Sequence, residues 1–244
     1  MGIRKRILGL TNAALKPLGV EVIPIVATRP WDSDFQRWIA EAEATGRDPN
    51  EVGDLEWSDD PLKEALEAHY LPYIHREAVV LELGPGTGRM TRHILSRCRE
   101  MILADYSAFV CRWLAKYLKG KGNFKLYLID RPLLPMLGAG SVDVIVANGV
   151  FEHIDIDDLF CFLEEFHRVL KPGGVISFNF DNIMTHDGMM WFKKFQREPG
   201  SRCTFRFYHP EVLRRLAEEV GLRVLQLSTG SSRFAHIDLQ RPAA

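Results

Sequence analysis

The sequence predicts an α/β fold, in which a mostly parallel β-sheet is flanked by helices and preceded by an N-terminal helical extension. Two observations carry this prediction. Short apolar runs such as Ala78–Leu83 and Val142–Ala147 are bounded by turn residues, which is typical of strands buried on both faces of a parallel sheet. Other segments carry apolar residues every three or four positions, the spacing of helices that cover a sheet.

Composition fits one compact domain with an addition. The chain has 244 residues, 46% of them hydrophobic, which is enough to bury one substantial core. A net charge of −1 argues against a dedicated nucleic-acid-binding protein. The cysteines are scattered without metal-ligand spacing, and no apolar run reaches the ~20 residues of a membrane span. We therefore expect a cytoplasmic protein with reduced thiols and no transmembrane segment.

The N-terminal extension is expected to cover residues 1–75, with the main domain over residues 76–244. Residues 3–18 form an amphipathic basic helix, for which two interpretations stay open. The helix contacts an anionic membrane surface, or it packs on the domain or on a homodimer partner. An acidic stretch follows, predicted to be a solvated face with a short helix around Trp31–Ile39. A further helix is expected over Asp59–Pro72.

A glycine-rich turn, Gly84-Pro85-Gly86-Thr87-Gly88, follows the strand at Ala78–Leu83. Apolar residues from Met90 to Cys98 predict a helix directly after it. A strand, a glycine-rich turn and a helix together bring backbone N–H groups to the carboxyl edge of the sheet, where α/β folds bind ligands. The dinucleotide fingerprint requires a glycine where this chain has Arg89, so NAD is not the expected ligand.

The second strand, Met101–Asp105, ends in an acid. Asp105 lies about 20 residues beyond Gly84, the offset at which an acid binds ribose hydroxyls. A carboxylate suits this task because its two oxygens can accept both hydroxyls. The alternative for Asp105 is a helix N-cap, which Ser107 could supply equally well. The neighbouring Tyr106 either stacks on adenine or packs as an ordinary aromatic residue.

The rest of the chain continues the alternation of strands and helices. Asp130 closes the third strand, and Asn148 follows the fourth. The remaining predicted elements are strands over Phe124–Ile129, Val142–Ala147 and Val175–Phe180, a helix that ends at Lys171–Gly174, a last helix that begins at His209, and a closing pair of strands over Leu222–Ser228 and Phe234–Leu239.

The order and spacing of these pieces, from Ala78 to Leu239, resemble the small-molecule branch of class I S-adenosylmethionine (SAM)-dependent methyltransferases, with a methyltransferase type 11-like domain. Glu82–Gly88 is similar to the first motif of this family, and Phe166–Gly174 is very similar to its helix-to-strand junction. The resemblance implies a Rossmann-like sheet of seven strands in the order 3-2-1-4-5-7-6, in which only strand seven is antiparallel.

The resemblance also implies SAM as cofactor and S-adenosyl-L-homocysteine as its product. It places Asp105 on the ribose, Asp130 on the adenine amino group and Asn148 near the methionyl end. The full set of expected cofactor-binding residues is Glu82, Gly84, Pro85, Gly86, Gly88, Asp105, Tyr106, Asp130 and Asn148.

Two other branches of the family are also similar in part. Ribosomal RNA adenine dimethylases carry Asn-Leu-Pro-aromatic after the fourth strand, whereas this chain has Asn148-Gly149-Val150-Phe151. That difference and the near-neutral charge disfavour an RNA substrate. Phe151-Glu152-His153 instead resembles quinone-type O-methyltransferases, some of which bind a divalent metal through two glutamates and this histidine. Gly149 stands at the first glutamate position, so we expect no metal site.

His153 is the first candidate for a catalytic base, because histidine titrates near neutral pH and can accept a proton from a hydroxyl acceptor. Its alternative role is capping or packing at the start of the next helix. His186 is the second candidate. It lies in residues 182–206, a methionine- and aromatic-rich segment predicted to cover the acceptor, with an ordinary amphipathic helix as the alternative. Basic residues in this segment suit an anionic acceptor.

The predicted function is therefore methyl transfer from SAM to an oxygen or nitrogen atom of a small-molecule acceptor, such as a saccharide, a lipid-linked compound or another anionic metabolite. One alternative is a SAM-binding regulatory partner without transfer activity. Another is an enzyme similar to a polyamine synthase, in which acids after the fourth strand hold a cationic substrate. Only Glu152 lies close to that position here.

Overall fold

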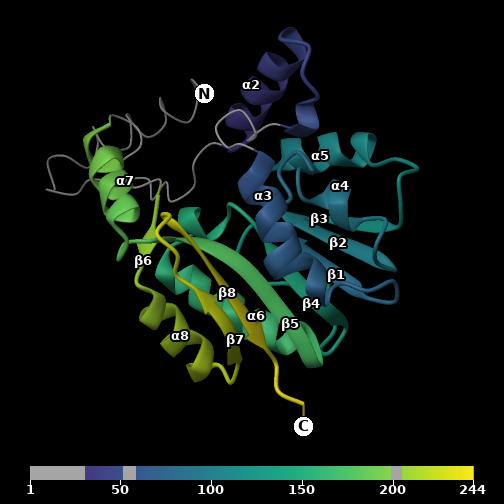
Figure 1. Ribbon diagram of the computed structural model, residues 1–244. Helices are drawn as coiled ribbons and strands as arrows, with labels where there is room; N and C mark the ends of the chain where they lie inside the picture. The colour runs from purple at the N-terminus through teal and green to yellow at the C-terminus, as the bar shows by residue number, and fades with distance from the viewer. Residues whose placement is uncertain (1–30, 52–58, 199–204, 244) are drawn as a thin grey trace, which may run out of the picture. The chain divides into compact units, whose positions relative to one another are not determined.

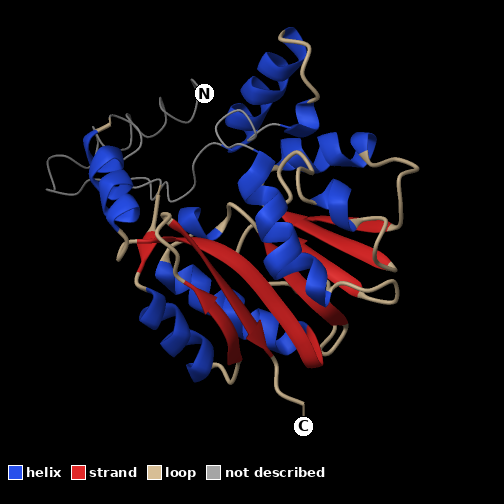
Figure 2. Cartoon of the chain, viewed as in Figure 1, coloured by secondary structure: helices blue, strands red, loops and turns tan. Residues whose placement is uncertain are grey.

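The structure is a computed structural model that describes residues 31–51, 59–198 and 205–243. These residues belong to one compact unit, Trp31–Ala244. A central sheet lies between helices on both of its faces, as Figures 1 and 2 show. The basic helix expected over residues 3–18 lies outside the described residues, as does part of the segment 182–206.

The sheet has the strand order β3-β2-β1-β4-β5-β8-β7. Strands β1 to β5 pair in parallel, whereas β8 is antiparallel to both of its neighbours. This confirms the predicted order, because β7 and β8 are the expected strands six and seven. A short additional strand, β6, pairs with the end of β5. The strands are β1 (Val79–Leu83), β2 (Glu100–Asp105), β3 (Phe124–Leu128), β4 (Val142–Ala147), β5 (Leu170–Asn182), β6 (Phe207–Tyr208), β7 (Arg223–Ser228) and β8 (Phe234–Gln240).

Helices cover the two faces of the sheet in separate groups. One core cluster joins α6 and α8 to the sheet, and the other joins α3, η3, α4 and α5 to it. The bounds are α2 (Trp31–Ala44), η2 (Pro49–Glu51), α3 (Asp59–Ala65), η3 (Leu66–Tyr70), η4 (Leu71–Tyr73), α4 (Thr91–Ile94), α5 (Ala108–Tyr117), η5 (Phe151–His153), α6 (Ile156–Val169), α7 (His186–Arg197) and α8 (Pro210–Glu219).

Strand β1 is buried on both faces, as its continuous apolar run predicts. Leu81 and Leu83 belong to the cluster under α6, and Val80 belongs to the cluster that contains Tyr70 of η3. Burial of an apolar side chain of this size contributes roughly 1.5–3 kcal/mol. The central strand is thus packed between the two helix layers, which fixes the start of the turn that follows it.

The helix expected from Met90 to Cys98 is shorter than predicted, because α4 spans only Thr91–Ile94. The chain then turns, and the Arg99 N–H donates to the Ala78 carbonyl at 2.9 Å. That bond aligns the start of β2 beside β1. The helix therefore ends at Ile94, before the last residue of the apolar pattern, because the chain has to pair β2 with β1.

Strand β5 begins earlier than the predicted Val175–Phe180. Leu170 already pairs with Val142, and the Gly173 N–H donates to the Arg241 carbonyl at 2.8 Å. The Lys-Pro-Gly-Gly run ends α6 as predicted, but its backbone groups find partners on both neighbouring segments. It therefore forms the first, irregular part of the strand.

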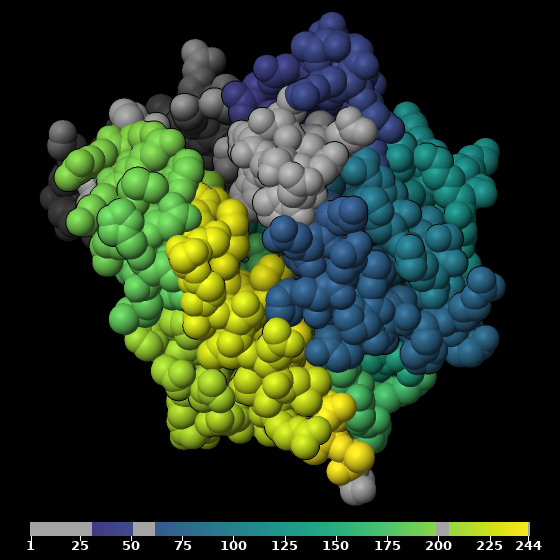
Figure 3. Space-filling view, in the orientation of Figure 1, coloured from purple at the N-terminus to yellow at the C-terminus, as the bar shows by residue number. Residues whose placement is uncertain are grey.

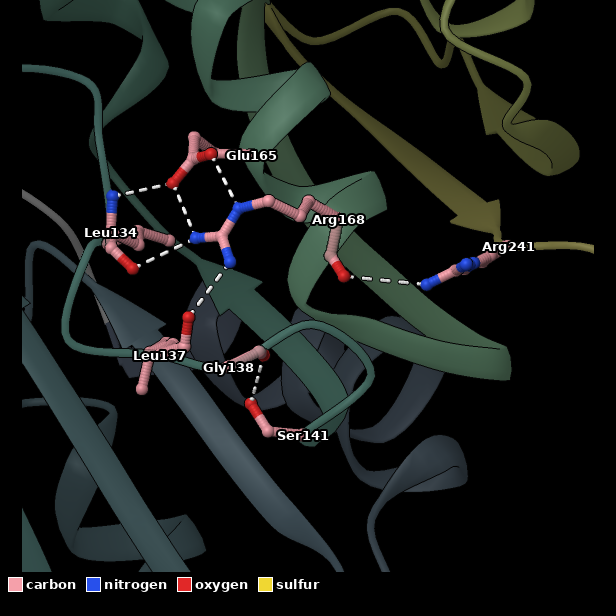
Figure 4. Close-up of polar contacts among 7 residues, drawn as sticks. All are labelled: Leu134, Leu137, Gly138, Ser141, Glu165, Arg168 and Arg241. Carbon is pink, nitrogen blue, oxygen red and sulfur yellow. Dashed lines mark hydrogen bonds and ion pairs between the residues drawn. The ribbon is translucent and has the colours of Figure 1, made fainter.

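Arg168 connects the end of α6 to the loop that precedes β4 through hydrogen bonds, as Figure 4 shows. Its guanidinium donates to Glu165 at 2.7 Å and to the carbonyls of Leu137 and Leu134 at 2.9 and 3.0 Å. Glu165 in turn accepts from the Leu134 N–H at 2.7 Å. The guanidinium of Arg168 lowers the pKa of Glu165, so the pair stays ionised and the loop stays in place.

The α3–η3–η4 run packs beside the C-terminal hairpin, as Figure 3 shows. His69 Nδ1 lies 3.1 Å from Asp238 Oδ2, and the Ser177 hydroxyl donates to Asp238 Oδ1 at 2.6 Å. His69 and His236 stack with ring centroids 4.3 Å apart. These buried polar contacts fix the N-terminal helices over β5 and β8.

Candidate functional site

The glycine-rich turn after β1 depends on glycine for its backbone path. Gly84, Gly86 and Gly88 have φ of 65°, 54° and 88°, in the left-handed region that side chains disfavour. A Cβ at Gly84 would lie 2.6 Å from a methyl carbon of Val150, and one at Gly86 would lie 3.4 Å from the Phe35 ring. The turn therefore passes directly beneath the loop that follows β4 and beneath helix α2.

Glu82, the second-to-last residue of β1, is buried and accepts a hydrogen bond from the Thr91 hydroxyl at 2.7 Å. Burial raises the pKa of Glu82 to about 8, and the nearby Asp105 carboxylate adds to the increase. The side chain links the strand to α4 across the turn. Within the expected cofactor motif, Glu82 therefore helps to hold the shape of the glycine turn.

Asp105, the last residue of β2, is only 6% exposed. It accepts the Ser107 N–H at 2.7 Å. Burial raises the pKa of Asp105 to about 6, partly offset by backbone N–H groups that include that of Gly86. The N-cap of α5 is Ser107, whose hydroxyl accepts the Val110 N–H at 3.1 Å. The alternative role of Asp105 as helix cap therefore does not apply.

Helix α2 adds a residue that the sequence had placed in a solvated acidic face. Asp32 Oδ1 accepts from the Ser107 hydroxyl at 2.6 Å and from the Phe109 N–H at 3.1 Å. The Ser107 bond lowers the pKa of Asp32. Through Asp32 and Phe35, α2 covers both the glycine turn and the end of β2. No local pattern marks Asp32 among the neighbouring acids.

The other expected cofactor residues lie at the same edge with different exposure. Tyr106 packs edge-on against Phe162, with ring centroids 6.5 Å apart. Asn148 Oδ1 accepts from the Tyr70 hydroxyl at 3.2 Å. The Asp130 side chain is 89% exposed and lies 3.5 Å from Arg131. The structure thus brings Asp105 and Asn148 to the glycine turn and leaves Asp130 at the surface.

The two candidate bases have different surroundings. His153, the last residue of η5, lies half-buried between the rings of Trp31 and Phe205, each with its centroid 4.9 Å away. His186 is exposed at the start of α7, where Thr185 accepts the Gly188 N–H as the N-cap. Only His153 therefore belongs to the group of residues around the end of β4.

Helix α7 occupies the middle of the segment expected to cover the acceptor. Its Phe195 stacks on Phe205 with centroids 4.0 Å apart, and Phe205 contacts His153. The basic side chains of Lys193, Lys194 and Arg197 are exposed. The aromatic side of the helix therefore faces the site, and its basic side faces solvent.

Three buried charged residues lie near this helix, and two of them, Asp181 and Arg233, were not singled out from the sequence. Glu152 is 1%, Asp181 0% and Arg233 5% exposed. Arg233 Nε lies 3.3 Å from Asp181 Oδ1, and its guanidinium lies 4.4 Å from the Phe234 ring and 4.7 Å from the Trp191 ring. Asp181 ends its apolar run much as Asp105 does, which is the one sequence signal that could have found it.

Residues 80–174 match a family profile described as a methyltransferase domain. Residues 80–174 therefore carry a methyltransferase domain, and solved SAM-dependent methyltransferases share its fold. SAM is the cofactor of this family, and the site fits it. The glycine turn leaves no room for a side chain at Gly84, and Asp105 offers a buried carboxylate beside the Gly86 backbone.

Curated relatives match this chain over only part of their own length. An uncharacterized methyltransferase of Oceanobacillus iheyensis is 27% identical over 146 residues, or 59% of this chain and 63% of that protein. A malonyl-[acyl-carrier protein] O-methyltransferase of Coxiella burnetii is 32% identical over 102 residues, or 41% of this chain and 32% of that protein. The chain thus spans less than two thirds of either relative.

Solved structures share the fold of this methyltransferase domain. A putative methyltransferase from Haloferax volcanii, in complex with the Trm112 methyltransferase activator, matches with a TM-score of 0.62 and 18% identity over 85% of this chain and 97% of that chain. A SAM-dependent methyltransferase from Aquifex aeolicus matches with a TM-score of 0.57 and 17% identity over 80% of this chain and 98% of that chain. At these identities the likeness concerns the fold alone.

Two features are absent from the part of the chain that the structure describes. No helix in it is both long and apolar enough to cross a membrane. Within residues 31–51, 59–198 and 205–243, no group of three or more His, Cys, Asp or Glu residues has an arrangement that could hold a metal ion.

Proposed function

We propose that this protein transfers a methyl group from SAM to a small-molecule acceptor, with His153 as the base that accepts the acceptor's proton. The observation that carries the proposal is the position of His153. It lies half-buried between Trp31 and Phe205, in the turn that follows β4 just beyond Asn148. When bound, SAM supplies an activated methyl group on a sulfonium, so the protein has only to align the acceptor and exclude water.

Binding and orientation are assigned to the residues around the glycine turn. Asp105 is proposed to hold the ribose, since its carboxylate is already fixed by the Ser107 N–H. Asn148 is held by the Tyr70 hydroxyl at 3.2 Å, which fixes its amide beside Gly84. Such preset groups lose little freedom when the ligand binds.

Exclusion of water is assigned to α2 and α7. Trp31 of α2 contacts His153 directly, and Phe195 of α7 stacks on Phe205, which contacts His153 from another side. In this aromatic surrounding, the imidazole would take the proton of an acceptor hydroxyl, whose oxygen would receive the methyl group that SAM supplies when bound. A neutral imidazole is suited to this step near pH 7.

The test is a methyl-transfer screen with labelled SAM against extracted metabolites, saccharides and lipids. With an acceptor hydroxyl, His153→Ala should lower turnover by roughly 10²–10⁴-fold, because general-base catalysis contributes that much, and leave cofactor affinity nearly unchanged. His75→Ala, at an exposed histidine outside the site, is the matched control. Full turnover of the His153 variant on a hydroxyl acceptor would refute the base, and no transfer to any extract would refute the activity.

A further inference from the structure

A group of buried polar atoms without hydrogen-bond partners lies beside His153. In the part of the chain that the structure describes, Glu152 Oε2 and both carboxylate oxygens of Asp181 have no such partner. Buried polar atoms in native proteins are nearly always hydrogen-bonded, so several unsatisfied ones close together need an explanation. A ligand that supplies donors is one.

The two carboxylates lie at the edge of the sheet that holds the glycine turn. Glu152 directly precedes His153, and a Cβ at Gly149 would lie 3.7 Å from its Oε1. Its carbonyl is fixed by the Arg206 N–H at 2.6 Å. Asp181 lies near the carboxyl end of β5, the strand that pairs with β4. Both carboxylates therefore belong to the region just beyond Asn148, where the acceptor is expected.

The charges of this group do not balance. Arg233 Nε lies 3.3 Å from Asp181, and aromatic rings of Trp191 and Phe234 pack on its guanidinium. Glu152 Oε2 has no hydrogen-bond partner among the described residues. Two buried carboxylates therefore face one guanidinium, and an uncompensated buried charge is strongly unfavourable. A cationic ligand would supply the missing charge.

Burial raises the pKa of Glu152 to about 8 and that of Asp181 to about 7, and in each case the Arg233 charge offsets part of the increase. Both groups are thus costly to ionise in the absence of a further cation. The guanidinium of Arg233 disfavours a divalent metal at the same place, whereas an ammonium group can donate hydrogen bonds to Glu152 and Asp181 at a lower charge.

We propose that Glu152, supported by Asp181, binds an ammonium group of the methyl acceptor, which makes the acceptor a small molecule that carries an amine. This rests on the proposed function and names the substrate class of the same site. Glu152 holds the cationic end, and the adjacent His153 acts on the atom that is methylated. The exposed Lys193, Lys194 and Arg197 take no part, so the anionic acceptor suggested by their sequence is not needed.

The test uses the full chain saturated with S-adenosylhomocysteine and titrated calorimetrically with phenethylamine or with its uncharged counterpart 2-phenylethanol. Wild type should bind the amine more tightly than the alcohol. Glu152→Gln should weaken amine binding by about tenfold or more, since a charge-assisted hydrogen bond is lost. Glu164→Gln, the same change on the exposed face of α6, should leave amine binding unchanged.

Several results would overturn the subsite: no amine binding to wild type, equal binding of amine and alcohol, or equal amine binding to wild type and Glu152→Gln. The S-adenosylhomocysteine titration that precedes each run should be unaffected by either variant, and its failure in wild type would count against the proposed function instead. If Glu152→Gln does not fold by circular dichroism, Asp181→Asn takes its place and should weaken amine binding in the same direction.

Discussion

At the scale of single residues, Glu82 shows how burial disfavours the charged form of a carboxyl group in the site. Its carboxylate is buried, accepts one hydrogen bond from Thr91, and has a pKa of about 8 against 4.5 for an ordinary glutamate. The folded protein therefore binds a proton that the unfolded chain releases between these two values. The associated stability is fully present below about pH 4.5 and is lost as the pH rises through about 8.

Glu82→Gln should remove this pH dependence, because a neutral amide keeps an oxygen for Thr91 and carries no charge. In urea unfolding from about pH 6 to about pH 9, wild type should lose roughly 2–4 kcal/mol more stability than the variant. Glu164→Gln, on an exposed residue of α6, should follow wild type. Parallel pH profiles for wild type and Glu82→Gln would show that Glu82 is not buried as described.

The residues of the site differ in how well their positions could be predicted from the sequence. The positions of Gly84 and Asp105 at the carboxyl ends of β1 and β2 were predictable, since a glycine-rich turn and an acid at the end of an apolar run are local signals. Arg233 was not predictable, because its turn of Ser-Ser-Arg-Phe is typical of an exposed hairpin connection. Its burial arises only when α7 brings Trp191 over it and β5 brings Asp181 beside it.

At the scale of elements, α2 is the helix whose role the sequence hides. An acidic, weakly apolar helix predicts a solvated face, and Asp32 is indeed exposed as a residue. Yet its carboxylate accepts two hydrogen bonds at the first turn of α5, from the Ser107 hydroxyl and the Phe109 N–H. An anion at a helix N-terminus is favourable there, and the same contact places Phe35 over Gly86.

Asp32→Ala should therefore release α2 from the site. We expect a loss of about 1 kcal/mol in the free energy of unfolding, the usual effect of losing a helix-capping group, and faster amide hydrogen exchange within α2. Glu43→Ala, on an exposed position of the same helix, is the matched control. Unchanged exchange in α2 would mean that Phe35 and Trp31 hold the helix without the Asp32 contacts.

Strand elements were predicted more closely than helices. The positions of the strands follow from buried apolar runs. Their order and the antiparallel β8 were expected only from the resemblance to class I methyltransferases, and the sheet confirms both. The helix expected from Met90 to Cys98 was wrong beyond Ile94. The Arg99 N–H bonds to the carbonyl of Ala78, which is distant in sequence, and the local spacing of apolar residues cannot predict such a contact. Periodicity indicates which face is buried, but not where tertiary contacts end an element.

At the scale of the whole molecule, the site joins segments from both ends of the compact unit. Helix α2 lies at its start, and Arg233 lies just before β8 near its end. Between them, β1, β2 and β4 meet at the centre of the sheet and place Gly84, Asp105 and Asn148 at one edge. A ligand bound there contacts elements that unfold together, so its binding energy should appear as global stability.

S-adenosylhomocysteine at a hundredfold excess over its Kd should stabilise the fold by about 2.7 kcal/mol and raise Tm by roughly 5–10 °C for a chain of this size. Asp105→Ala should reduce this rise to about half or less, because a tenfold to hundredfold loss of affinity follows when a charge-assisted contact to the ribose is removed. NAD should give no rise, since Arg89 replaces the glycine its binding loop requires. An undiminished rise in Asp105→Ala would remove Asp105 from the ribose site, and a comparable rise with NAD would contradict the assignment of the glycine turn.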